Sequence, residues 1–219
     1  MRKSLLIATL MLVLAACAPT KKDEGKTETA VIAKTSETPL YKTIEEMVWA
    51  EIKDPEIGRT KEDIAQFKRV ETDSMITIGR GLDRTYYIQK YEYFKSDFDE
   101  DGTEDTLIPV IEEFGASSAT TFYYLFLNKG GKITFIEKYD AYKMATDNIT
   151  NKDVISCGWF NFNGLSGSLL VGSGVYYGYN DAHCCPSYFI EKLKFKFNPK
   201  NNEFEQVYQS KLEHTEQTE

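Results

Sequence analysis

The sequence has few residues of the kinds that usually perform catalysis. Only 2 histidines occur among its 219 residues, which leaves few general bases and few imidazole ligands for a metal. No Gly-x-Ser-x-Gly nucleophile elbow is present. Basic residues number 26 against 34 acidic ones, for a net charge of −8. That charge excludes a protein that binds the phosphates of a nucleic acid.

The composition is otherwise that of a folded protein rich in β-structure. Hydrophobic residues make up 42% of the chain and charged residues 27%, which is enough to bury a core and excludes wholesale disorder. The aromatic residues are mostly tyrosine (14) and phenylalanine (13), and both favour strands. The length suits one ordinary domain.

The amino terminus is a basic pair followed by an apolar run that ends in a cysteine. The run from Leu5 to Ala16 is shorter than the roughly 20 residues that a helix needs to cross a bilayer, and it is typical of a signal peptide. Residues 14–17, Leu-Ala-Ala-Cys, resemble the lipobox of bacterial lipoprotein precursors. The resemblance implies cleavage before Cys17 and acyl chains, such as palmitate, on that residue. Several acyl chains anchor a protein stably to a membrane.

The residues after Cys17 indicate to which membrane a lipoprotein of this kind is sorted. Ala18 stands where an aspartate retains many lipoproteins in the inner membrane, so the resemblance implies an outer-membrane lipoprotein that faces the periplasm. The triplet at residues 22–24, Lys-Asp-Glu, is similar to a signal that sends some bacterial lipoproteins to the cell surface. Surface display is therefore the alternative.

The rest of the chain predicts a mainly β, α+β fold: an antiparallel sheet or sandwich preceded by two short helices. The first helix covers residues 44–52, and the second begins at a capping box of Thr60 and Asp63 and continues to Val70. Strands are expected over residues 75–79, 85–95, 106–114, 120–128, 133–139, 155–162, 168–177, 188–197 and 204–209. The expected organisation is a signal peptide over 1–16, the lipidated cysteine and a flexible tether over 17–40, one globular domain over 41–212 and a frayed acidic tail over 213–219.

An acidic loop lies between two of the predicted strands. Asp97, Asp99, Asp101 and Asp105 stand at positions 1, 3, 5 and 9 of a loop with glycine at position 6, which is the first part of a calcium-binding pattern. Alternate side chains on a tightly curved loop converge, and the Thr103 carbonyl can join them. These five residues are the predicted ligands of a structural calcium ion.

The loop resembles the short Asp-x-Asp-x-Asp-Gly-x-x-Asp loops of dockerins and integrin-type repeats. It departs from an EF-hand, since Ile108 replaces the bidentate glutamate at position 12. Together with residues 121–125 and the Cys-Cys-Pro at 184–186, the loop also looks like part of a set of uncharacterised bacterial lipoproteins. The resemblance spans about residues 90–190 and implies no activity.

Three cysteines remain besides Cys17. In an oxidising compartment, Cys157 is expected to form a disulfide with Cys184 or Cys185. A bond between the adjacent pair is strained because neighbouring Cα atoms are too close. The alternative is a soft-metal or redox site made of Cys157, His183, Cys184 and Cys185.

The function predicted from these features is that of a lipid-anchored envelope protein. Its calcium-stabilised β domain would act as a binding or structural module for an envelope protein or polymer, without nucleic acid. The tyrosines at residues 86–93 and 176–179 could stack on sugars. An exported, hydrolase-like enzyme is the other alternative, although no catalytic residue can be named.

Overall fold

The computed structural model describes residues 38–81, 84–115, 118–147, 149, 151–182 and 185–214. Strands predominate, which confirms the predicted mainly β fold. The helical segments are α1 (Thr38–Ile52), the 3-10 helix η1 (Pro55–Ile57), α2 (Lys61–Ile64) and α3 (Ala141–Asp147). The strands are β1 (Lys68–Glu71), β2 (Met75–Gly79), β3 (Arg84–Gln89), β4 (Phe94–Ser96), β5 (Asp105–Phe114), β6 (Ser118–Lys129), β7 (Lys132–Asp140), β8 (Val154–Ser166), β9 (Leu169–Gly178), β10 (Tyr188–Asn198), β11 (Glu203–Gln209) and β12 (Leu212–His214).

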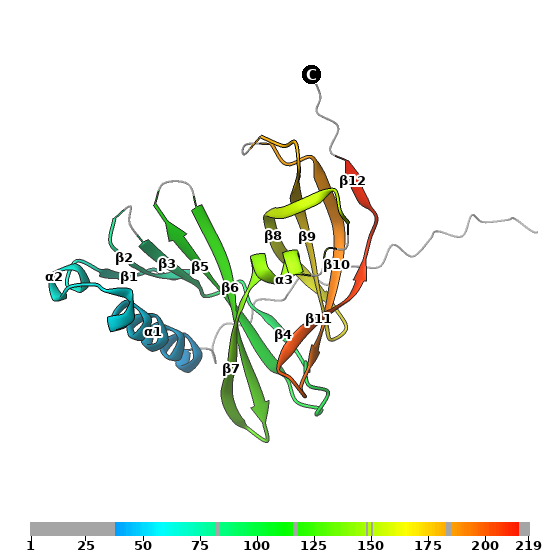
Figure 1. Ribbon diagram of the computed structural model, residues 1–219. Coiled ribbons are helices and arrows are strands. Elements are labelled where there is room, and N and C mark those ends of the chain that lie inside the picture. Colours follow the sequence, from blue (N-terminus) through cyan, green and yellow to red (C-terminus); the bar gives the residue numbers. More distant parts are fainter. Residues whose placement is uncertain are drawn as a thin grey trace, which may run out of the picture.

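The strands form two antiparallel sheets (Figure 1). The first sheet has the order β1-β2-β3-β5-β6-β7, and β4 pairs with β5 beside this path. The second has the order β11-β10-β9-β8, and β12 also pairs with β10. Consecutive strands pair because short turns join them, as at the hairpin where Lys129 lies opposite Lys132. Strand β8 is therefore an edge strand of the second sheet.

Helix α1 packs against one face of the first sheet. Its residues Ile44, Val48 and Ile52 recur every four positions and are fully buried, so they form one apolar stripe. The stripe contacts the isoleucines of β2 and β3 in a common core cluster. The helix ends just before Asp54-Pro55, because a proline disfavours the helical conformation of the residue before it.

A cluster of charged side chains also attaches α1 to the sheet. Glu51 on the helix lies 2.8 Å from Arg84 Nη2 and 2.9 Å from Lys138 Nζ. The Tyr86 hydroxyl donates a hydrogen bond to Glu51 over 3.1 Å. Glu112, only 1% exposed, pairs with Arg84 beneath them. Burial, reinforced by the charge of Glu51, raises the pKa of Glu112. The first sheet thus holds a buried carboxylate, and the cations beside it offset the cost of burying its charge.

The second sheet covers the opposite face of the first sheet. Along β10, Leu193, Phe195 and Phe197 are buried and alternate with lysines at positions 194 and 196, the period of two expected of a strand with one buried face. These apolar side chains pack with Tyr123 and Leu125 of β6 in a second core cluster. The molecule therefore has three layers: α1, the first sheet and the second sheet.

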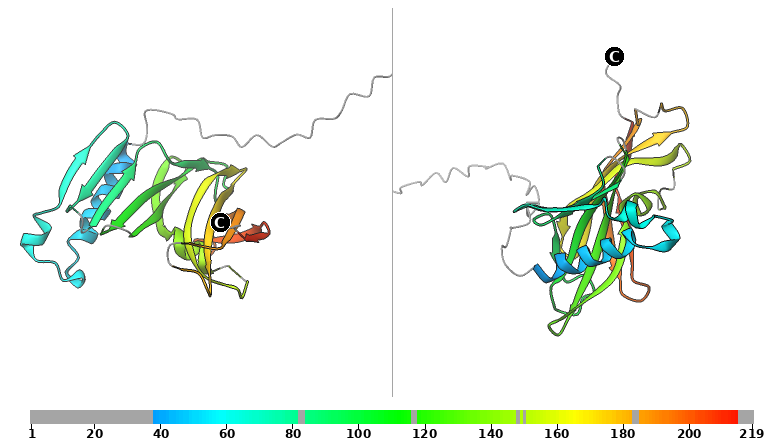
Figure 2. Two further views of the ribbon diagram at one scale, coloured as in Figure 1. Left: turned by 90° about the horizontal axis from the view of Figure 1, so that it is seen from above. Right: turned by 90° about the vertical axis from the view of Figure 1, so that its left-hand side faces the viewer.

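The two sheets diverge toward one end (Figures 1 and 2). Along β6, Tyr123, Leu125 and Leu127 are buried against the second sheet. Further toward the start of this strand, Thr121 is half-buried and Ala119 is exposed. The second sheet therefore covers only part of the inner face of the first one.

The local elements differ from the expected ones at three places. The second helix ends at Ile64, and Val70 lies in β1, where it pairs with Thr77. Glu213 and His214, at the start of the predicted frayed tail, pair with β10, and residues 215–219 lie outside the described residues. Helix α3 was not expected. Within the part of the chain that the structure describes, no helix has the length and apolar character needed to span a bilayer.

Candidate functional site

The acidic loop connects β4 to β5 and brings three of its aspartates together. One carboxylate oxygen each from Asp97, Asp99 and Asp105 lies within 4.8 Å of the other two. Gly102 has a φ of 89°, a left-handed conformation that glycine adopts without strain, and it allows the chain to turn there. A cation between these three oxygens would have carboxylate ligands from both ends of the loop.

Hydrogen bonds to backbone N–H groups hold these carboxylates in place. Asp97 accepts one from Asp101 and another from Gly102, each over 2.9 Å. Asp105 accepts from Phe98 and from Asn128, also over 2.9 Å each. The loop is therefore fixed to the start of β5 and to the end of β6.

Two predicted calcium ligands behave differently from the three-aspartate group. Asp101 is exposed and accepts a hydrogen bond over 2.9 Å from the N–H of Thr103. The Thr103 hydroxyl contacts Asp101 and the Asn128 carbonyl. Asp101 is absent from the group of converging carboxylates, because its side chain closes a local turn with Thr103 instead.

Burial and neighbouring charges set the electrostatics of the loop. Burial raises the pKa of Asp105, and the nearby charge of Asp99 raises it further, against the lowering effect of its two N–H donors. Hydrogen bonds from Thr103 lower the pKa of Asp101. The side chain of Asp99 is only 3% exposed, and its oxygen lies 3.4 Å from Lys129 Nζ. A cation bound between the three carboxylates would favour the charged form of Asp105.

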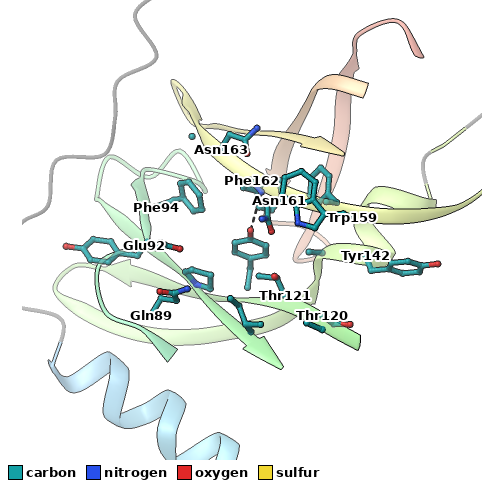
Figure 3. A pocket seen from close by; sticks show the side chains of 18 of the residues that line it. Gln89, Glu92, Phe94, Thr120, Thr121, Tyr142, Trp159, Asn161, Phe162 and Asn163 are labelled. Carbon is teal, nitrogen blue, oxygen red and sulfur yellow. Dashed lines mark hydrogen bonds between the residues drawn. The ribbon is translucent and has the colours of Figure 1, made fainter. Parts of the chain in front are cut away.

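A cavity of about 550 Å³ lies where the two sheets diverge (Figure 3). This volume is within the range of ligand pockets, about 300–1,000 Å³. Its walls come from β3, the segment leading into β4, β5, β6, the start of α3 and β8. Tyr123 lies in its wall, and its hydroxyl accepts a hydrogen bond over 3.2 Å from the N–H of Phe162. Burial raises the pKa of Tyr123 to about 12, so this hydroxyl stays neutral.

Alternation along β8 gives the cavity wall two kinds of side chain. Phe160 and Phe162 are buried and pack edge to face with each other and with Phe195. Asn161, between the two phenylalanines, is half-buried. Trp159, just before Phe160, is 50% exposed. The strand thus fixes a polar and aromatic surface on a rigid apolar base.

The acidic loop and the cavity share a structural element. Phe94 of β4 lies in the cavity wall, packs edge to face with Phe162 and comes three residues before Asp97. Phe98 in the loop is buried and packs against Phe204. Strand β4 therefore connects the acidic loop directly to one wall of the cavity.

The predicted disulfide is not present in this structure. Cys157 is a free thiol, buried in the core between the sheets, whereas Cys185 lies exposed in the segment before β10. Burial raises the pKa of the Cys157 thiol to about 12, so its thiolate form is suppressed. This argues against Cys157 as a metal ligand or redox group. His183 and Cys184 lie outside the described residues.

Sequence reasoning missed most of the cavity. Of the tyrosines considered for sugar binding, Tyr86, Tyr93 and Tyr176 are buried in the core, and Tyr91 and Tyr93 line the cavity. The alternation of Trp159 and Asn161 with two phenylalanines was a usable signal for a surface on β8. Nothing in the sequence placed that surface opposite β3 and β6.

Cys17 and the rest of the signal and tether residues up to 37 lie outside the described residues. Comparisons with protein-family models, with curated proteins and with solved structures gave no match. The function is therefore argued from the geometry of the loop and the cavity.

Proposed function

We propose that this chain is a lipid-anchored protein of the bacterial cell envelope whose β domain binds a ligand between its two sheets. The observation that carries the proposal is the cavity of about 550 Å³ with exposed Trp159 in its wall. Ligand pockets are typically concavities of this size lined by aromatic side chains and a few polar groups. The lipobox-like residues ending at Cys17 support the anchor, and the expected location is the outer membrane.

We further propose that calcium stabilises this domain through the acidic loop. The converging oxygens of Asp97, Asp99 and Asp105 support that role. Carboxylate oxygens are the ligands that calcium prefers. Burial and, to a smaller extent, the charge of Asp99 raise the pKa of Asp105, and a bound cation would offset both. Because Phe94 links this hairpin to the cavity wall, calcium would keep the binding site ordered.

Hydrogen–deuterium exchange tests the binding role without assuming a ligand class. The lipidated protein is incubated with calcium and, separately, with polysaccharide, protein and lipid fractions of the envelope. Residues 158–164 belong to an edge strand, so part of their N–H groups lack a ladder partner and exchange fast. We expect one fraction to slow exchange there and at residues 89–94 and 118–123, which line the same cavity.

The outcome that contradicts the proposal is equally specific. If no fraction slows exchange at these three segments, the cavity is not a binding site. Slowed exchange confined to other surfaces, such as the outer face of α1 around Trp49, would also reject it. Calcium alone should slow exchange at residues 97–105 and serves as the internal control for a folded loop.

A further inference from the structure

The wall of the cavity carries almost no charge. Its 20 described residues include one carboxylate, Glu92, and no lysine, arginine or histidine. An anionic ligand would lose its hydration on entering without gaining a cationic partner. This excludes phosphates, nucleotides and acidic polymers as good ligands. The wall therefore selects against ligands that carry negative charge.

Several polar side chains in the wall have no hydrogen-bond partner among the described residues. Gln89 of β3, Thr121 of β6 and Asn161 of β8 are half-buried, and in the described part of the chain their side chains make no hydrogen bond to another protein group. An amide or hydroxyl in such a position gains most from a ligand that donates and accepts hydrogen bonds. Figure 3 shows Asn161 on the β8 wall and the other two on the facing wall.

Aromatic side chains form the rim of the same cavity. Trp159 is 50% exposed and Tyr142 of α3 is 44% exposed, and both lie at one end of the cavity (Figure 3). Within the described residues, neither ring packs against another aromatic ring. A flat indole face offers an apolar platform with little conformational entropy to lose.

Resting on the proposed binding role, we infer that the ligand is an uncharged carbohydrate that stacks on Trp159. A sugar ring has an apolar face of C–H groups and a rim of hydroxyls that each donate and accept hydrogen bonds. The apolar face matches the indole, and the hydroxyls match the amides of Gln89 and Asn161 and the hydroxyl of Thr121. The absence of cationic side chains from the described wall selects neutral sugars over acidic ones.

An extended peptide is the competing ligand, since β8 is an edge strand that could accept another strand. The structure disfavours this arrangement at two points. The N–H of Phe162 already donates to the Tyr123 hydroxyl, and α3 packs against β8. A continuous ladder along β8 is therefore blocked, whereas a sugar needs only separate hydrogen bonds.

Isothermal titration calorimetry tests the inference. The lipidated protein is held in calcium and in a detergent without a sugar headgroup. The probes are cellohexaose, mannohexaose, xylohexaose, an oligogalacturonate of equal length, and an uncharged hexapeptide that alternates threonine and valine. We expect saturable binding of at least one neutral hexasaccharide, with the acidic oligosaccharide about tenfold weaker or more, because the wall offers it no cation.

Substitutions inside and outside the cavity test whether the sugar binds there. Trp159→Ala should weaken binding about fivefold or more, since it removes the stacking platform. Thr121→Val keeps the shape of the side chain but removes its hydroxyl, and it should weaken binding by a smaller factor. Tyr179→Ala removes a more exposed aromatic side chain, 74% accessible, outside the cavity and should change the affinity less than about twofold.

The outcomes separate this inference from the proposed function. If no neutral hexasaccharide binds, or if Trp159→Ala binds as well as the wild type, the carbohydrate assignment is wrong. Binding of the hexapeptide alone, with exchange still slowed around the cavity, would keep the binding role and reject the sugar. Absence of any slowed exchange around the cavity would reject both.

Discussion

Replacing Asp99 with asparagine should remove most of the stabilisation that calcium gives the domain. Asp99 is a member of the three-aspartate group, and its side chain is 3% exposed. Extracellular calcium modules bind with a Kd of about 0.1–1 mM. At the tighter end of that range, calcium at about 1 mM adds about 1.4 kcal/mol to the free energy of unfolding. For a domain of this size, that raises Tm by about 3–6 °C.

The same substitution should have the opposite effect without calcium. The charge of Asp99 contributes to the raised pKa of Asp105, so asparagine at this position removes a repulsion. The calcium-free variant is expected to be as stable as the calcium-free wild type or more stable. Asp101→Asn is the matched control because Asp101 lies outside the group, and this variant should retain most of the calcium effect.

The assay is a set of melting curves with EGTA, calcium or magnesium. Magnesium should add much less than calcium, because it requires near-octahedral geometry and dehydrates reluctantly. Equal Tm values in all three conditions would refute the reasoning. Loss of the calcium effect in Asp101→Asn but not in Asp99→Asn would show that the ion binds elsewhere in the loop.

The pH dependence of calcium-free stability follows from the raised pKa of Asp105. Folding favours the protonated carboxyl, so its contribution to stability is fully present below its ordinary pKa of 3.8 and is lost as the pH rises through the raised value. Calcium binds the ionised form. Its stabilising effect should therefore shrink as the pH falls through that raised pKa, as melting curves at several pH values would show.

Three further predictions concern other parts of the molecule. Cys17→Ser should abolish acylation and release the protein from membranes; palmitate label on that variant would contradict the anchor. Arg84→Met should lower the free energy of unfolding by about 3 kcal/mol at neutral pH, because it leaves Glu112 buried beside fewer cations, and urea titration should find a smaller loss in acid, where Glu112 is protonated. Native Cys157 should resist alkylation until the domain unfolds, owing to its burial and its pKa of about 12; equal labelling of folded and unfolded protein by peptide mapping would contradict its position.

Much of the strand pattern could be predicted from the sequence because its causes are local. Along β10, Leu193, Phe195 and Phe197 alternate with lysines, and this period of two defines both the strand and its buried face. The stripe of α1 and the capping box of α2 have equally local causes. The box forms as predicted, with Thr60 accepting a hydrogen bond from the N–H of Asp63.

The remaining elements depend on contacts between distant residues. Val70 belongs to a strand because β2 is available for pairing, not because of its neighbours in sequence. Glu213 and His214 are ordered by β10 in the same way. Tertiary pairing of this kind overrides local propensity, and for that reason a short helix and a frayed tail were predicted there.

The acidic loop has local causes that the sequence reveals, whereas the cavity depends on contacts between distant residues. The spacing of aspartates was enough to predict that Asp97, Asp99 and Asp105 converge, because nine consecutive residues contain the whole pattern. The spacing alone could not show that the Asp101 carboxylate would accept a hydrogen bond from Thr103 and so lie outside the group of converging carboxylates. The cavity joins Gln89, Thr121 and Asn161 from three separate strands, and only the divergence of the two sheets brings them together.

The most direct test of the central claim is the response of the two indole N–H signals in an NMR spectrum. The chain has 2 tryptophans: Trp159 lies in the cavity wall, and Trp49 lies on α1 beside Lys53. Titration with the neutral hexasaccharide that calorimetry selects should shift the Trp159 signal and leave the Trp49 signal in place. A shift of Trp49 alone, or no shift of either signal at saturation, would contradict binding between the sheets.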